Sequence, residues 1–141
     1  MVKLFGLAWD REKDTIFTQP LHLDPKATTK RAILSSIASN YDVFQINGPM
    51  LNRARMFMHT LQCDRSVDWD TRLDDLRVRE WVNISKQLNN SPCIELPRCM
   101  GRRDDAYNLV VCTDASKSMY GAVLYLQNWI DDNLSFVAAK N

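Results

Sequence analysis

Three β-rich runs close the sequence, and their spacing limits the folds open to this part of the chain. They span residues 109–116, 120–126 and 135–140, with short polar segments between them. Runs of β-branched and aromatic residues separated by short turns are typical of antiparallel strands. The pattern in the last quarter of the chain therefore predicts a three-stranded meander, with Asp114 at the end of its first strand.

The first residues predict a short β-hairpin. Residues 2–9 and 15–18 are rich in strand-forming residues, and they flank a charged turn at residues 10–14. Pro20 and Pro25 then keep the next stretch extended.

Three helices are expected in the middle of the chain, which gives an α+β fold class. Thr28 or Thr29 can cap the first helix, Pro49 suits the first turn of the second, and residues 68–70 open the third. Apolar residues recur at helical spacing in each: Ile33, Leu34, Ile37, Ala38 and Tyr41; then Leu51, Ala54, Phe57, Met58 and Leu61; then Leu73, Leu76, Trp81, Ile84 and Leu88. A short extended piece at residues 94–97 and a polar connector at residues 98–105 follow.

The composition excludes several classes of protein. Eighteen basic and 17 acidic residues give a net charge of +1, so no overall electrostatic field attracts the chain to nucleic acid or to membranes. With 45% hydrophobic residues among 141, the chain can form a core. No apolar run approaches the roughly 20 residues of a membrane span, and the first residues lack a signal-peptide pattern. We therefore expect a soluble, intracellular protein.

The four cysteines fit no paired metal or redox motif. Cys63, Cys93, Cys99 and Cys112 lack C-x-x-C spacing, so reduced thiols are the simplest interpretation. An alternative is a zinc set in which His59 and Cys63 share a helix face and Cys93 and Cys99 supply the other ligands.

Four segments, in order along the chain, resemble the polyprotein of BEL/Pao-type LTR retrotransposons, where reverse transcriptase joins ribonuclease H. They are residues 2–10, 29–42, 49–55 and the strands between 109 and 140. The parent polyprotein copies retrotransposon RNA into DNA and degrades the RNA strand. The resemblance therefore implies a cytoplasmic polyprotein fragment, held in a virus-like particle when the element is active.

The resemblance also implies three parts. Residues 1–25 would end the reverse transcriptase palm as a primer-grip-like hairpin, and residues 26–105 would form a helical thumb and connection. Residues 106–141 would be the truncated start of a ribonuclease H-like domain, a three-stranded antiparallel meander.

Within this arrangement, Asp114 would be a catalytic residue and the first metal ligand of the nuclease. Two Mg²⁺ (or Mn²⁺) ions, held by about four carboxylates, activate a water and stabilise the leaving oxygen of a cleaved phosphodiester. The site is incomplete, so we expect the fragment alone to be inactive and to bind no metal. Considered without the resemblance, a turn-initiating carboxylate is the favoured interpretation of Asp114, because a single carboxylate is a weak motif. Asp104 and Asp105 precede the strand, too far away to share a metal with it.

Basic residues are the remaining candidates. In a thumb-like setting they would follow the phosphates of an RNA–DNA hybrid or primer–template duplex without reading bases. The candidates for nucleic-acid binding are Lys30, Arg31, Arg53, Arg55, Arg102 and Arg103. Ordinary surface charge is the alternative. The other expected partner is the rest of the polyprotein, and no membrane is involved.

Two further functions stay open at this point. The region is often catalogued as a Pao retrotransposon peptidase, and aspartic peptidases present each catalytic Asp in an Asp-Thr-Gly or Asp-Ser-Gly turn. Residues 113–116, Thr-Asp-Ala-Ser, lack that glycine. A non-catalytic nucleic-acid-binding or interaction remnant is the other alternative.

Overall fold

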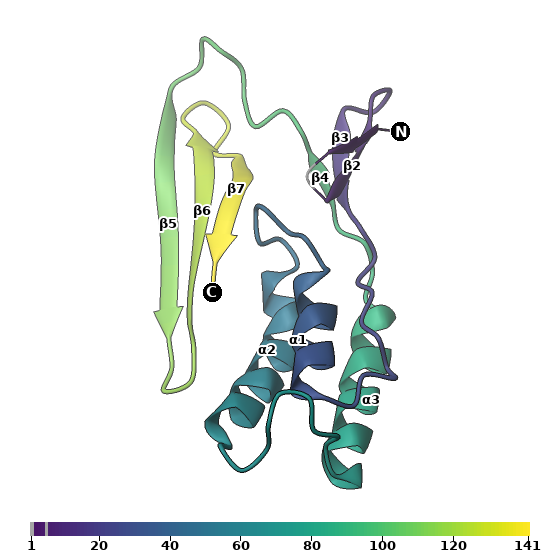
Figure 1. Ribbon diagram of the computed structural model, residues 1–141. Coiled ribbons are helices and arrows are strands. Elements are labelled where there is room, and N and C mark those ends of the chain that lie inside the picture. The colour runs from purple at the N-terminus through teal and green to yellow at the C-terminus, as the bar shows by residue number, and fades with distance from the viewer. Residues whose placement is uncertain (1, 5) are drawn as a thin grey trace. The chain divides into compact units, whose positions relative to one another are not determined.

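The computed structural model describes residues 2–4 and 6–141 and has an α+β fold with three helices and two small antiparallel sheets. Figure 1 shows the order of the elements along the chain. The chain divides into two compact units. Unit 1 contains the described residues up to Gln19, together with Asp42–Gly48 and Cys93–Asn141, and unit 2 contains Pro20–Tyr41 and Pro49–Pro92. The functional division at residues 25 and 105 stays a prediction.

The first sheet of unit 1 extends the expected hairpin to four strands in the order β1-β2-β3-β4. The strands are β1 (Val2–Leu4), β2 (Leu7–Asp10), β3 (Thr15–Thr18) and β4 (Glu95–Pro97). Gly6 adopts a φ of 80°, a conformation that glycine tolerates, and this turn divides the predicted 2–9 run into two paired strands. Phe5, which falls within the predicted hairpin, lies outside the described residues. The predicted extended piece near residue 95 is confirmed as β4, because Leu96 pairs with Ile16.

The second sheet of unit 1 is the expected meander, β5-β6-β7. It consists of β5 (Tyr107–Ala115), β6 (Tyr120–Asn128) and β7 (Leu134–Lys140), coloured green to yellow in Figure 1. None of the described residues in these three strands is fully buried. Leu109 and Val111 are 69% and 61% exposed, so this sheet presents apolar side chains to solvent.

Unit 2 carries the helices α1 (Lys30–Ala38), α2 (Gly48–Cys63, which begins at the boundary of unit 1) and α3 (Asp75–Asn89). Thr29 caps α1 as expected, since its hydroxyl accepts a hydrogen bond from the Ala32 amide. The apolar stripe predicted for α2 is confirmed in full, because all five of its residues are buried. A single core joins the three helices, with Trp81 fully buried and stacked on Phe57 at a ring separation of 6.0 Å.

Two predictions for the third helix are wrong. The helix begins at Asp75 rather than near residue 68, because the Asp74 side chain caps it by accepting a hydrogen bond from the Arg77 amide. Leu76, predicted to lie in the apolar stripe, is 76% exposed. At about 100° per residue it lies roughly 140° around the helix from Trp81, away from the core.

In the first helix, Ile33 and Ile37 are buried as predicted, whereas Leu34, Ala38 and Tyr41 are exposed. Nine residues form too short a helix to bury every apolar position of the predicted stripe. No helix among the described residues is both long and apolar enough to cross a membrane.

Candidate functional site

Asp114 lies near the end of β5, where the antiparallel register pairs it with Gly121 of β6. Residues directly opposite each other in such a pair have their side chains on the same face of the sheet. A Cβ added at Gly121 would meet no atom within 4 Å. The exposed Asp114 carboxylate therefore faces open space on its cross-strand side.

The turn after β5 is organised by Ser116, not by Asp114. The Ser116 hydroxyl accepts hydrogen bonds from the amides of Ser118 and Met119, at 3.2 and 3.1 Å, and the Ser116 amide donates to the Met119 carbonyl at 2.7 Å. Asp114 makes one local contact, in which Oδ1 accepts a hydrogen bond from the Ala115 amide at 2.8 Å. This arrangement gives little support to the interpretation of Asp114 as the residue that starts the turn.

Asp105 belongs to the opposite end of β5. Its Oδ2 accepts hydrogen bonds from the side-chain amide of Asn128 at 2.8 Å and from the Tyr107 hydroxyl at 3.3 Å. A strand of this length spans roughly 30 Å, so Asp105 cannot share a metal with Asp114. Its role is to fasten the connector to the sheet, and the neighbouring Asp104 is exposed.

The residues present do not by themselves fit a two-metal site. Within residues 2–4 and 6–141, no group of three or more His, Cys, Asp or Glu side chains is placed to hold a metal ion. Asp114 supplies one carboxylate, whereas a two-metal nuclease needs about four. The alternative considered for the cysteines, a zinc set of four ligands, is also absent from this part of the chain.

Of the six basic candidates for nucleic-acid binding, Lys30 is the one that is buried. It is only 4% exposed, and its Nζ donates a hydrogen bond to the Asp64 carbonyl at 2.6 Å. A phosphate contact needs an accessible ammonium group. The Lys30 ammonium is therefore not placed to contact a phosphate.

The segment that Lys30 contacts is held by further bonds at Asp64. Oδ1 accepts hydrogen bonds from the Ser66 hydroxyl and amide, and Oδ2 accepts one from the Arg77 guanidinium at 2.6 Å. The Ser66 hydrogen bonds first, and Arg77 after them, hold the pKa of Asp64 well below its usual range. The segment between α2 and α3 is thus fixed to α1 and to α3.

Arg31 is exposed but carries an ion pair. Its Nε and Nη2 donate to the two carboxylate oxygens of Asp70, at 2.7 and 3.0 Å. The Asp70 carboxylate raises the pKa of Arg31, and the guanidinium lowers the pKa of Asp70. This bidentate pair competes with any phosphate for the same guanidinium.

Arg53 and Arg55, both on α2, have neutral partners. Arg53 donates to the side-chain oxygen of Gln87, and Arg55 donates to that of Asn52 at 3.5 Å. Neither α1 nor α2 contains an acidic residue. The two arginines therefore lie on a helix that carries no acidic side chain.

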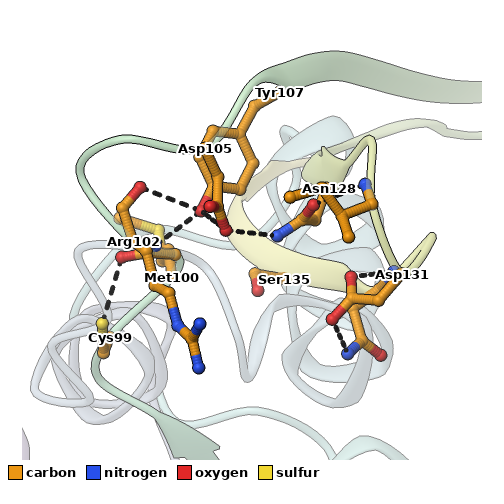
Figure 2. Close-up of a pocket in the computed structure, with 11 residues that line it drawn as sticks. Cys99, Met100, Arg102, Asp105, Tyr107, Asn128, Asp131 and Ser135 are labelled. Carbon is orange, nitrogen blue, oxygen red and sulfur yellow. Dashed lines mark hydrogen bonds between the residues drawn. The ribbon is translucent and has the colours of Figure 1, made fainter.

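Arg102 and Arg103 lie in the connector before β5, and both are exposed. Figure 2 shows the Arg102 guanidinium directed away from Asp105, while dashed lines join the Arg102 backbone to the Tyr107 hydroxyl. That hydroxyl accepts a hydrogen bond from the Arg102 amide at 2.5 Å, and its single proton can go either to the Arg102 carbonyl, at 3.1 Å, or to Asp105. Burial raises the pKa of Tyr107, so the hydroxyl keeps its proton over the physiological range.

Trp9 is the centre of a cationic cluster that the sequence did not reveal. The guanidinium groups of Arg11 and Arg98 lie over its ring, 5.4 and 5.3 Å from the centroid, and its Nε1 donates to Asp14 at 3.1 Å. Arg98 also donates twice to the Asp14 carboxylate, and this guanidinium holds the pKa of Asp14 below its usual range. The spacing of Trp9 and Arg11, two residues apart, was the one sequence signal for this cluster. Arg98 is distant in sequence, and the pairing of β3 with β4 brings it to Trp9.

Comparison with known proteins supports the resemblance to BEL/Pao retrotransposons. A family model described as the Pao retrotransposon-like RNaseH-like domain matches residues 29–141, which is all of the chain except its first 28 residues. Searches of curated proteins and of solved structures found no match. The chain therefore belongs to the Pao retrotransposon-like RNaseH-like domain family.

Proposed function

We propose that this chain is the part of a retrotransposon polyprotein that links reverse transcriptase to ribonuclease H. In this proposal, residues 1–25 end the polymerase palm, residues 26–105 serve as thumb and connection, and residues 106–141 begin the nuclease domain. The observation that carries the proposal is the family match over residues 29–141, together with a β5–β7 meander that presents Asp114 at a strand end.

The helical part contributes to handling of the primer–template duplex or RNA–DNA hybrid. Arg53 and Arg55 contact phosphates, because they are the α2 cations whose partners are neutral amides. Exposed Arg102 and Arg103 add to this interaction from the connector. Such contacts position the nucleic acid without reading its sequence.

The test of this role is the salt dependence of hybrid binding. Replacing Arg53 and Arg55 together with Gln should weaken binding of an RNA–DNA hybrid and reduce the slope of log affinity against log salt by roughly 1.5 to 2. The matched control removes the same charge from α3 by replacing Arg79 and Lys86 with Gln. Equal losses in both double variants would show that only overall charge matters, and an unchanged slope in the α2 variant would reject the assignment.

Asp114 contributes one carboxylate to the nuclease site, and other acidic residues of the parent protein complete the set. Mg²⁺ or Mn²⁺ bound there would supply the charge that activates water and stabilises the leaving oxygen. The contribution of this chain is to hold the carboxylate at the end of a paired strand, with its Oδ2 free of local hydrogen bonds among the described residues.

The test uses the parent protein that includes the rest of the nuclease domain. Asp114→Asn should abolish cleavage of the RNA strand of a hybrid while leaving hybrid affinity and circular dichroism unchanged, because an amide cannot replace an anionic ligand. The control is Asp131→Asn, which changes another exposed carboxylate of unit 1. Retained cleavage in Asp114→Asn would reject the role. Peptide cleavage that pepstatin-like inhibitors block would favour the peptidase alternative.

A further inference from the structure

The last two turns of α2 present an imidazole and a thiol side by side. His59 and Cys63 are one helical turn apart, and both are exposed. The Cys63 Sγ lies 3.9 Å from each ring nitrogen of His59. Imidazole nitrogen and thiolate sulfur are the preferred protein ligands of Zn²⁺. Ligands at i, i+4 on one helix face can bind one Zn²⁺, as the paired histidines of zinc-binding helices do.

The surface around this pair suits close approach by another protein surface. Residues 56–63 contain no charged side chain, and Met56 leaves 46% of its surface exposed. The neighbouring cation is Arg55, one turn before His59, which is partly buried and donates to Asn52. On the other side of the helix, Phe57 and Leu61 are buried in the core, which fixes the backbone that carries the two ligands. Cys63 is the last residue of α2, where the partial negative charge of the helix end favours a bound cation.

Two ligands make only half of a tetrahedral zinc site. Within the described part of the chain, no third His, Cys, Asp or Glu joins the pair. A second copy related by a two-fold axis would bring an identical pair and complete a His₂Cys₂ set. We propose that His59 and Cys63 form a half-site through which Zn²⁺ bridges two copies of this chain, α2 against α2.

The test measures stoichiometry and mass in the full chain, kept reduced by a phosphine. Zn²⁺ should bind at half an equivalent per chain and double the mass seen by sedimentation, and a chelator should reverse the change. Co²⁺ in the same site should give a thiolate charge-transfer absorption. His59→Ala and Cys63→Ser should each weaken binding by more than about tenfold, since even loss of an outer partner of a metal ligand costs 10- to 100-fold.

The chain supplies matched controls and a rescue variant. His22→Ala and Cys93→Ser remove the other histidine and another exposed thiol, and they should change neither the stoichiometry nor the mass. Cys63→His keeps two ligands on the same turn, so it should retain the zinc-dependent dimer but lose the cobalt–thiolate absorption. A full equivalent of Zn²⁺ bound without any increase in mass, unchanged binding in His59→Ala, or a zinc-induced increase in mass that the chelator does not reverse would each overturn the proposal.

Discussion

Replacing Lys30 with Met tests whether this lysine acts inside the helical unit. Its Nζ donates to the Asp64 carbonyl at 2.6 Å and is almost fully buried. A hydrogen bond from a charged donor contributes about 1.5–3 kcal/mol. Methionine keeps a buried, unbranched side chain in place of the lysine methylene groups. Removing the ammonium also removes the cost of burying its charge, and this offsets part of the stability lost with the hydrogen bond. We expect a net destabilisation of about 1–2 kcal/mol, which lowers the melting temperature of a unit of this size by roughly 4–16 °C.

Circular dichroism can isolate this effect, because all three helices belong to unit 2. Urea unfolding followed by the helical signal should show a lower midpoint for Lys30→Met and an unchanged midpoint for Lys26→Met, which alters an exposed lysine of the same unit. Hybrid affinity of the folded Lys30→Met protein should match that of the parent chain. An unchanged midpoint combined with a weaker, less salt-dependent hybrid affinity would refute the reasoning and return Lys30 to the phosphate-binding set.

Three further predictions concern stability and association. Hydrogen bonds from the neighbouring Ser66 hold the pKa of Asp64 below its ordinary value. The Asp64 carboxylate therefore stabilises the fold above about pH 3.9, and this contribution is lost as the pH falls below that value. In Asp64→Asn, the free energy of unfolding should fall less steeply as the pH is lowered below about 3.9. Leu88→Ala should cost about 2–5 kcal/mol in urea unfolding, whereas Leu76→Ala should change stability by less than about 0.5 kcal/mol, and the reverse order would contradict the assignment of the α3 stripe. The exposed apolar residues of β5 and its free edge favour self-association, so Leu109→Lys with Val111→Lys should lower the sedimentation mass in the presence of a chelator.

Local sequence rules account for most elements of this fold. The β5–β7 meander, the Thr29 cap and the α2 stripe depend on alternation, capping and helical period, which are visible in short windows of sequence. The start of α3 was missed because residues 68–70 and Asp74 are both plausible caps. The choice between them depends on tertiary hydrogen bonds, such as the one from the Leu73 amide to the Thr28 carbonyl.

The burial of Lys30 could have been predicted from helical periodicity. Lys30 precedes Ile33 by three residues and Ile37 by seven, which places all three on one face of α1. Arg31, one position later, falls on the exposed side. The cluster of Trp9 with Arg98 had no comparable signal, because it depends on pairing between strands about 80 residues apart, and single-sequence patterns carry no information on such contacts.

The near-zero net charge does not argue against nucleic-acid binding, because ion pairing is uneven across the basic residues. Charges farther apart than about 8 Å are largely screened at physiological ionic strength, so local pairing decides what a phosphate meets. In unit 2, Arg31, Arg72 and Arg77 each bind a carboxylate, and a phosphate would have to displace it. Arg53 and Arg55 bind only neutral amides and lie on a helix without acidic residues. The partner of each arginine, rather than the total charge, therefore separates the arginines that are already paired with a carboxylate from those that could meet a phosphate at little cost.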